Sequence, residues 1–336
     1  MTFEVGRLVI RAPNWLGDAV MALPAMSAVR QAHPQSIIAV AAIPAVAPLF
    51  LEQTSAAVNE VITLEPDRER DLLRAGRFDA VLLLPNSFRS AWSARRAGIP
   101  QRWGYAAGLR SALLTRAVRR TRDRVHQSTY YSNLVHGLDM PVGGTPPRVT
   151  VTARTASRAA TLLDDAGVPA GATIVGLAPG AAYGYAKRWP PARVAELIAR
   201  LARERGAVCV LGGAAGDRES GREIESALPS GIRVVNLIGR TDLRVFAGIL
   251  ARCRAFVSND SGAMHLAAAL GVPVTAIFGP TDERVTAPLG DHDVLLHPVF
   301  CRPCMLRECP IDHRCMKGVS VDSVFQAVSR HLGSRP

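Results

Sequence analysis

Short apolar runs alternate with helical patterns from one end of the chain to the other, and this alternation constrains the fold more than any other sequence feature. In the first half, the runs that predict strands are Arg7–Arg11, Ile37–Ile43, Glu60–Leu64 and Asp79–Leu84. In the second half they are Ile174–Ala178, Ala207–Leu211, Val234–Ile238, Ala255–Ser258 and Val274–Phe278. Strands that alternate with helices form parallel sheets with crossover helices. We therefore predict an α/β fold with two doubly wound, Rossmann-like domains.

The boundary between the domains is predicted in Met140–Arg148, a stretch with three prolines and two glycines. It divides the chain into a first domain at 1–145, a second at 146–318, and a final helix within 319–336. The region Gln101–Arg124 has no clear period and is interpreted as looser structure. In doubly wound domains ligands bind beyond the carboxyl ends of the strands, so two facing domains place the site in the cleft between them.

The loop after the first predicted strand, Arg11–Met26, carries a carboxylate at Asp18. Gly17 allows a tight turn just before it, and an apolar helix follows. One interpretation of Asp18 is a helix N-cap, because aspartate is a favoured cap residue. The other is a general base that faces the cleft.

A loop in the second half, Leu177–Arg193, offers a lysine to a phosphate. Its strand ends at Pro179-Gly180, small residues keep the backbone open, and Lys187 and Arg188 precede the next helix. Lys187 is one of only two lysines in a chain that otherwise uses arginine. One interpretation is that Lys187, beside a helix start, binds a phosphate group. The alternative is that Lys187 and Arg188 are a pair of basic residues on the surface.

Two further strand-end loops add polar groups to the same predicted site. In Val257–Asp282, Asp260 ends a strand, Ser261 and Gly262 begin a helix, and His265 lies on the same helical face. Backbone N–H groups at a helix start bind anions. In Leu211–Glu219, a glycine-rich turn precedes two carboxylates that suit ribose hydroxyls or a helix dipole, Asp217 and Glu219. These loops predict a site for a nucleotide sugar or a similar diphosphate.

Four cysteines, Cys301, Cys304, Cys309 and Cys315, lie within fifteen residues. A CxxC pair with two more cysteines is compatible with structural zinc, but such sites usually pair two CxxC knuckles and only one is present. We predict reduced thiols ahead of a zinc site, with disulfides last.

Three motifs, NWLGDAVMALPA, APGAAYGYAKRWP and SNDSGAMHLAAALGVPVTAIFGPTD, closely resemble those of the bacterial lipopolysaccharide heptosyltransferases and occur in the same order. The resemblance covers nearly the whole chain, and AKRWP and the cysteine-bearing loop are similar to those of the heptosyltransferase II members. It implies a GT-B fold with two Rossmann-like domains facing across a cleft. The first domain binds the acceptor, the second binds the nucleotide sugar, and the last helix packs back on the first domain.

The resemblance also implies the activity. Members transfer heptose from ADP-heptose, with inversion, to the heptosyl-Kdo inner core of lipid A, and they need no metal or other cofactor. Carried over residue by residue, Asp18 matches the catalytic aspartate and Lys187 the phosphate-binding lysine. The remaining substrate-binding positions implied are Asn14, Gly17, Gly180, Arg188, Asp260, Ser261, Gly262 and His265, with Asp217 or Glu219 as the ribose-binding acid.

Charge and hydropathy indicate where such an enzyme works. The net charge is +12, and the stretch from Arg89 to Arg124 holds ten arginines and one acid, Asp123. We interpret this stretch as attracting the anionic acceptor and the membrane surface rather than nucleic acid, because aromatics are few and no nucleic-acid motif occurs. No secretory signal opens the chain, and its most apolar stretch, Ile37–Leu51, is fifteen residues long, short of the roughly 20 that span a bilayer. We expect a monomer in the cytoplasm, peripherally bound to the inner membrane.

Two alternatives stay open. One is a GT-B transferase for another nucleotide sugar, and the other is a non-catalytic protein that binds a nucleotide or zinc. A nicotinamide dehydrogenase is disfavoured because no GxGxxG fingerprint occurs. The Asp291–Asp293 stretch has the form of a metal-binding DxD motif, but it follows a Pro-Leu-Gly turn and is interpreted as a surface turn.

Overall fold

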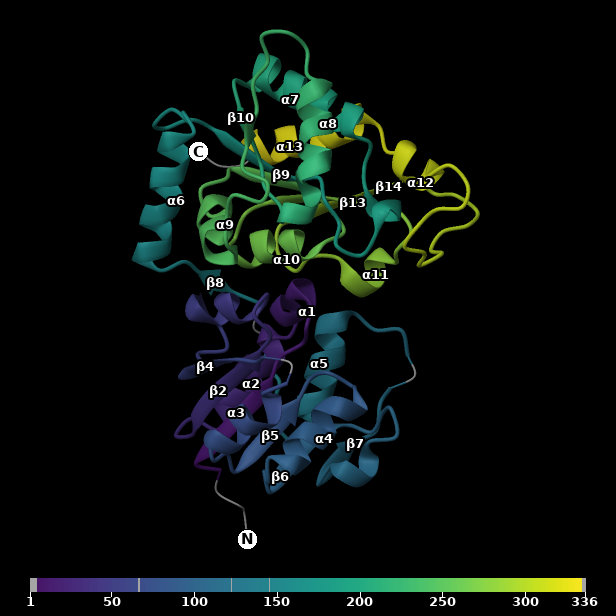
Figure 1. Cartoon of the computed structure of the whole chain (residues 1–336). Coiled ribbons are helices and arrows are strands. Elements are labelled where there is room, and N and C mark those ends of the chain that lie inside the picture. Colours follow the sequence, from purple (N-terminus) through teal and green to yellow (C-terminus); the bar gives the residue numbers. More distant parts are fainter. Residues whose placement is uncertain (1–4, 66, 122, 145, 334–336) are drawn as a thin grey trace. The chain divides into compact units, whose positions relative to one another are not determined.

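The computed structural model describes residues 5–65, 67–121, 123–144 and 146–333. The chain divides into two units, Met1–Thr150 and Val151–Pro336, each with its own six-stranded sheet (Figure 1). The division falls after Thr150 rather than after 145, because β8 (Val149–Thr150) pairs antiparallel with β3 (Gln53–Thr54) of the first unit.

The first sheet is wholly parallel, in the order β4-β2-β1-β5-β6-β7. Its strands are β1 (Arg7–Arg11), β2 (Ile37–Ala42), β4 (Glu60–Thr63), β5 (Ala80–Leu83), β6 (Gln101–Tyr105) and β7 (Arg116–Val118). The prediction of looser structure in Gln101–Arg124 was wrong, because it contains β6 and β7. Gln101 and Arg102, at the partly buried start of β6, and Arg116, exposed in β7, conceal these strands from a pattern based on hydrophobicity.

The helices of the first unit are α1 (Leu16–Met21), α2 (Leu23–Ala32), α3 (Glu69–Ala75), α4 (Phe88–Arg96) and α5 (Gln127–His136), with a 3₁₀ turn η1 (Ala47–Leu51) and another, η2 (Ser111–Leu113). α5 packs against α1 and α2, and α3 packs against α4. One core joins α3 and α4 to the sheet through Val9, Val81, Leu73 and Ala91.

The second sheet has the order β11-β10-β9-β12-β13-β14 and is also parallel. Its strands are β9 (Ile174–Ala178), β10 (Val208–Leu211), β11 (Val235–Asn236), β12 (Ala255–Asn259), β13 (Val274–Phe278) and β14 (His292–Leu296). β14 contains His292 and Asp293, so the interpretation of Asp291–Asp293 as a surface turn was wrong for these two residues. Asp293 there accepts a hydrogen bond from Arg330 at 3.1 Å.

The second unit contains α6 (Ala153–Asp165), α7 (Pro191–Arg205), α8 (Arg218–Ser226), α9 (Leu243–Leu250), α10 (Gly262–Ala269), α11 (Glu283–Thr286), α12 (Arg314–Lys317) and α13 (Val321–Gly333), with the 3₁₀ turns η3 (Tyr185–Lys187) and η4 (Ala215–Asp217). The apolar face of α13 lies in the core of this unit, with α7 and the sheet. Val324 and Val328 are fully buried there.

Both sheets have the same topology. Numbered along the chain, the strands of each lie in the order 3-2-1-4-5-6, so the direction of the winding reverses between β1 and β5 and between β9 and β12. Ligands of doubly wound sheets bind beyond the carboxyl ends of the strands at such reversals. The predicted site residues Asp18, Lys187 and Asp260 follow β1, β9 and β12, which border these two points.

None of the helices in the described part of the chain has the length and apolar character that crossing a membrane requires.

Candidate active site

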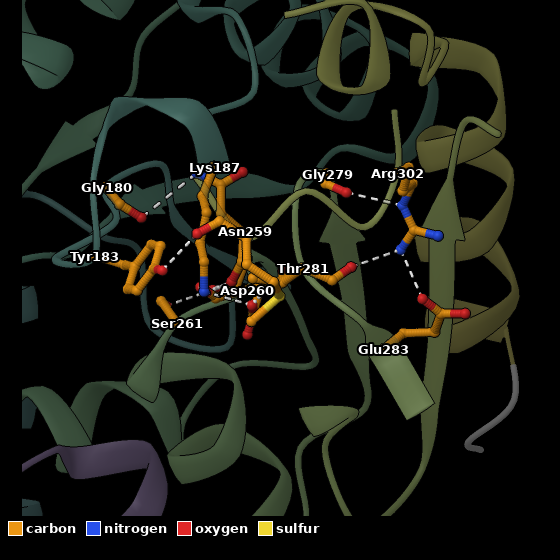
Figure 2. A network of polar contacts seen from close by, with 12 residues as sticks. Gly180, Tyr183, Lys187, Asn259, Asp260, Ser261, Gly279, Thr281, Glu283 and Arg302 are labelled. Carbon is orange, nitrogen blue, oxygen red and sulfur yellow. Dashed lines mark hydrogen bonds and ion pairs between the residues drawn. The ribbon is translucent and has the colours of Figure 1, made fainter. Parts of the chain in front are cut away.

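A buried ion pair lies at the reversal of the second sheet (Figure 2). Lys187 Nζ donates to Asp260 Oδ2 at 2.5 Å, and Thr281 Oγ1 donates to the same oxygen at 2.6 Å. The Lys187 and Asp260 side chains are only 10% and 6% exposed. The three residues follow three neighbouring strands, β9, β12 and β13, so the parallel sheet brings them together at one edge. Lys187 and Asp260 therefore lie in contact, as expected for residues that follow strands of one parallel sheet.

Asn259 fastens the lysine loop to the end of β12. Its amide donates to the Pro179 carbonyl at 2.7 Å, and its Oδ1 accepts from the backbone N–H of Trp189 at 3.2 Å. The residue is 2% exposed. Because it bonds to both ends of the loop that carries Lys187, Asn259 fixes where the ammonium group lies.

The start of α10 offers backbone donors beside this pair. Ser261 occupies the N-cap position, but its side chain makes no cap hydrogen bond and lies 3.1 Å from Ser258 Oγ instead. The first N–H groups of a helix have no intrahelical acceptor, so they are suited to an anion. Gly262 is the first helical residue, and His265 lies one turn later and is buried.

The structure distinguishes the two candidate ribose-binding acids. Asp217 lies 3.5 Å from Arg188 Nη2 and packs so closely on Gly180 that a Cβ there would be 2.1 Å from Asp217 Cγ. Arg188 also donates to Ser220 Oγ at 3.0 Å. Glu219 is exposed on α8. Asp217 therefore belongs with the lysine loop, while Glu219 does not join this group.

Residues 300–315, here called the cysteine segment, support the lysine loop. Tyr183 donates to the Met305 carbonyl at 2.8 Å, and the Ala186 N–H donates to the Arg307 carbonyl at 3.0 Å. Lys187 Nζ and the Arg307 guanidinium lie 4.6 and 5.2 Å from the centre of the Tyr183 ring. The segment is itself held by Arg302, which contacts Gly279, Thr281 and Glu283 (Figure 2).

The cysteines of this segment are free thiols, as are Cys209 and Cys253. Within the described ranges, no group of three or more His, Cys, Asp or Glu side chains gathers in a way that could hold a metal ion. The backbone N–H of His313 donates to Cys309 Sγ at 3.3 Å.

In the first unit, Asp18 lies in the first turn of α1 and is half-buried. The N-cap position is occupied by Trp15, so the interpretation of Asp18 as a cap was wrong. Asp18 Oδ1 accepts a hydrogen bond from the Tyr131 hydroxyl at 3.3 Å. Asn14, four residues earlier, accepts from Arg11 Nη2 at 3.0 Å, and Gly17 is buried next to Asp18.

The family model of glycosyltransferase family 9 (heptosyltransferase) matches residues 68–314. This chain belongs to glycosyltransferase family 9. It is 34% identical over 303 residues to lipopolysaccharide heptosyltransferase 2 of Salmonella typhimurium, which covers 84% of this chain and 85% of that protein. Among solved structures, it is similar to the ADP-heptose LPS heptosyltransferase II of E. coli, with a TM-score of 0.83, 31% identity, and coverage of 97% and 98% of the two chains. The E. coli heptosyltransferase WaaC with ADP shares the fold, with a TM-score of 0.73, 22% identity, and coverage of 97% and 99%.

Membership of family 9 confirms three predictions. The chain is a glycosyltransferase, its fold is GT-B with two Rossmann-like domains, and the resemblance to the heptosyltransferases was sound. A non-catalytic binding protein is therefore excluded.

Sequence reasoning did not select Asn259, Thr281, Tyr183 or Tyr131 as site residues. Asn259, Thr281 and Tyr183 stand in quoted motifs and were within reach. Tyr131 is separated from Asp18 by 113 positions, and nothing local connects them.

Proposed function

We propose that this family 9 enzyme transfers heptose from ADP-heptose to the heptosyl-Kdo inner core of lipid A, with inversion and without a metal ion. The proposal is supported by relatives that carry the name lipopolysaccharide heptosyltransferase 2 and are 34% identical to this chain. The observation that carries it is the buried Lys187–Asp260 pair beside the uncapped start of α10. The Lys187 ammonium, whose position Asp260 fixes, and the N–H groups at the start of α10 offer hydrogen-bond donors to a diphosphate at the reversal of the sheet.

In the proposed reaction the acceptor hydroxyl gives its proton to the Asp18 carboxylate. The hydroxyl oxygen bonds to the anomeric carbon of the heptose, and the bond from that carbon to the phosphate oxygen breaks. The electron pair leaves on ADP, where Lys187 and the N–H groups of Ser261 and Gly262 stabilise the developing charge. A single displacement by one base inverts the anomeric centre. The reaction requires the Asp18 carboxylate to contact the acceptor hydroxyl while that hydroxyl faces the anomeric carbon of the donor.

The donor site uses the remaining residues for orientation. Asp217, held by Arg188 and packed on Gly180, is the proposed acceptor of the ribose hydroxyls. Asp260 fixes the Lys187 ammonium, which has three N–H donors and therefore keeps donor capacity for a phosphate oxygen. His265 is proposed to contribute from the same helix. Asn14 and Gly17 belong to the acceptor side, next to Asp18.

The enzyme is further proposed to act as a peripheral protein at the cytoplasmic surface of the inner membrane. Large apolar side chains are exposed shortly after the carboxyl ends of β1, β5 and β6, at Trp15 (56%), at Phe88 in the first turn of α4 (49%) and at Leu109 (96%). Arg110 donates to the carbonyl of Ser87 at 3.5 Å, which brings the loop of Leu109 to the start of α4. The same unit has exposed arginines on α4 and after β7, at Arg95, Arg96, Arg119 and Arg120. Apolar side chains beside cationic ones suit an anionic lipid surface.

The direct test is incubation of the purified protein with ADP-heptose and a heptosyl-Kdo acceptor, in EDTA without added metal, followed by the anomeric configuration of the product. We expect ADP release that depends on the acceptor, and an inverted product. Asp18→Asn should lower turnover by about 10²–10⁴-fold while ADP binding is retained. If none of the heptose acceptors gives ADP release, the proposed substrate is wrong. If EDTA abolishes ADP release, the proposed metal independence is wrong. Release with UDP-sugars instead would identify another donor.

A further inference from the structure

The Tyr131 hydroxyl donates a hydrogen bond to the Asp18 carboxylate at 3.3 Å. It lies on α5, which packs against α1, the helix of Asp18. The tyrosine is 4% exposed, so its hydroxyl lies in the interior of the first unit, while Asp18 is half-buried. A buried phenol that donates a hydrogen bond to a half-buried carboxylate fixes the orientation of that carboxylate.

We propose that Tyr131 is a positioning residue for the general base: its hydroxyl binds Asp18 Oδ1, orients the carboxylate, and stabilises its charged form. The proposal rests on the role proposed above for Asp18. It adds a residue that acts through the base and does not touch the substrate.

The phenol is held in place independently of Asp18. The neighbouring Tyr130 hydroxyl accepts from Asn86 Nδ2 at 2.7 Å, and the Tyr130 carbonyl accepts from the Tyr105 hydroxyl at 2.6 Å. The rings of Tyr105 and Tyr130 lie 4.6 Å apart. Asn86 is in turn held by Arg110 at 3.3 Å. These contacts fasten α5 to the ends of β5 and β6, so Tyr131 approaches Asp18 from a fixed helix.

Arg110, which holds Asn86, is a buried cation. It is fully buried, and its hydrogen bonds within the described residues go to neutral oxygens, including the Tyr105 carbonyl at 3.0 Å. Burial lowers the pKa of Arg110 to about 10, so it is still charged at neutral pH. Asn86, which donates to Tyr130, is thus held by a buried cation.

The protonation of Tyr131 is suited to donation. Burial, and next the charge of Asp18, raise the pKa of Tyr131, so the phenol stays protonated across the working range of an enzyme. The Gln127 side chain, one turn earlier, also hydrogen-bonds the phenol. The other titratable groups on α5 and on the helices packed against it are Tyr130, His136 and Arg30. Arg30 is engaged with the Ser36 carbonyl at 2.8 Å.

The test is the pH profile of kcat for Tyr131→Phe in the full chain. A hydrogen bond to a carboxylate favours its charged form, so its loss raises the pKa of the base. The acid limb of the profile should move to higher pH by about one unit. Maximal kcat should fall about tenfold because the carboxylate loses its orientation, while KM for the donor stays within about twofold of the wild type.

The matched control is Ser36→Ala, which removes a buried side-chain hydroxyl of the same unit that donates to the Val5 carbonyl and takes no part in the contacts of Tyr131 or Asp18. It should lower stability to a similar extent and leave the acid limb in place. If Tyr131→Phe does not fold, fluorotyrosine at position 131 keeps the shape of the ring and strengthens the donor, and the acid limb should then move to lower pH.

The outcomes separate this inference from the proposed function. An acid limb that stays unchanged in folded Tyr131→Phe, or moves equally in Ser36→Ala, overturns the role of Tyr131. Full turnover in Asp18→Asn overturns the role of Asp18 itself, whatever Tyr131 does.

Discussion

At the scale of single residues, the contribution of the Lys187–Asp260 pair to stability can be separated from its proposed role in donor binding. Removing one partner of a buried pair leaves an uncompensated charge, which typically costs about 3 kcal/mol or more. Lys187→Met should therefore lower the free energy of unfolding by about that amount. In Lys187→Met/Asp260→Asn both charges are gone, so we expect part of the stability to return. Urea unfolding of the four proteins measures this coupling.

Donor binding should respond differently. ADP affinity, measured by calorimetry, should fall about tenfold or more in both the single and the double variant, because neither has the ammonium group. Lys317→Met is the matched control, since Lys317 is the only other lysine and is exposed. It should change neither quantity. Recovery of ADP affinity in the double variant would show that Lys187 does not bind the diphosphate.

At the scale of elements, the sequence predicted strands best where they are buried on both faces. β9 and β13 were predicted with their observed bounds and are wholly buried. α7 was predicted because it combines an early proline, a regular apolar face, and Gly206, whose φ of 60° ends the helix in the left-handed conformation. β6, β7 and β14 were missed because their residues are partly exposed, and a half-exposed strand next to arginines has no distinct period.

The site was predictable to the same extent. Residues at the ends of β9 and β12 could be expected to meet, because parallel strands end at one edge of the sheet. The support from the cysteine segment and the contact of Tyr131 with Asp18 could not, because both depend on tertiary packing between distant segments. The prediction of thiols rather than zinc concerned the chemistry of the cysteine segment and missed its contacts with the lysine loop.

The cysteine segment should be the reactive one. Burial opposes ionisation of Cys309, but N–H groups of Ile311, His313 and Asp312 outweigh it and lower the pKa of the thiol. Burial raises the pKa of Cys209 and of Cys253 to about 12. Because the thiolate is the nucleophile, alkylation of the native protein should begin at Cys309, with a rate that reaches half its maximum below pH 9.0, the ordinary thiol pKa.

Mass spectrometry of iodoacetamide-treated protein across a pH series checks this order. Cys309→Ser should lose the fastest phase, and Cys209 and Cys253 should react only after unfolding. Equal rates at all cysteines in the native protein would contradict the assignment.

At the scale of the whole molecule, a net charge of +12 with exposed apolar side chains predicts binding to anionic lipid. Each arginine near an anionic surface contributes about 1 kcal/mol at physiological salt. Vesicles with anionic lipid should therefore sediment the protein, and neutral vesicles should not. Raising the salt to about 1 M shortens the Debye length to about 3 Å and should weaken the binding.

The apolar part of this attraction can be tested with a matched pair of double variants. Phe88→Ser/Leu109→Ser removes two apolar side chains of the arginine-rich first unit. Phe88 is 49% exposed and Leu109 is 96% exposed. Phe300→Ser/Ile311→Ser removes two comparable side chains of the cysteine segment, which are 81% and 52% exposed. The first pair should reduce sedimentation with anionic vesicles at constant salt, and the second should not. Equal losses of sedimentation in both double variants would mean that exposed apolar area acts without regard to position. If neither variant loses sedimentation, charge alone is the attraction, and only the arginines of the first unit could direct this enzyme to a lipid surface.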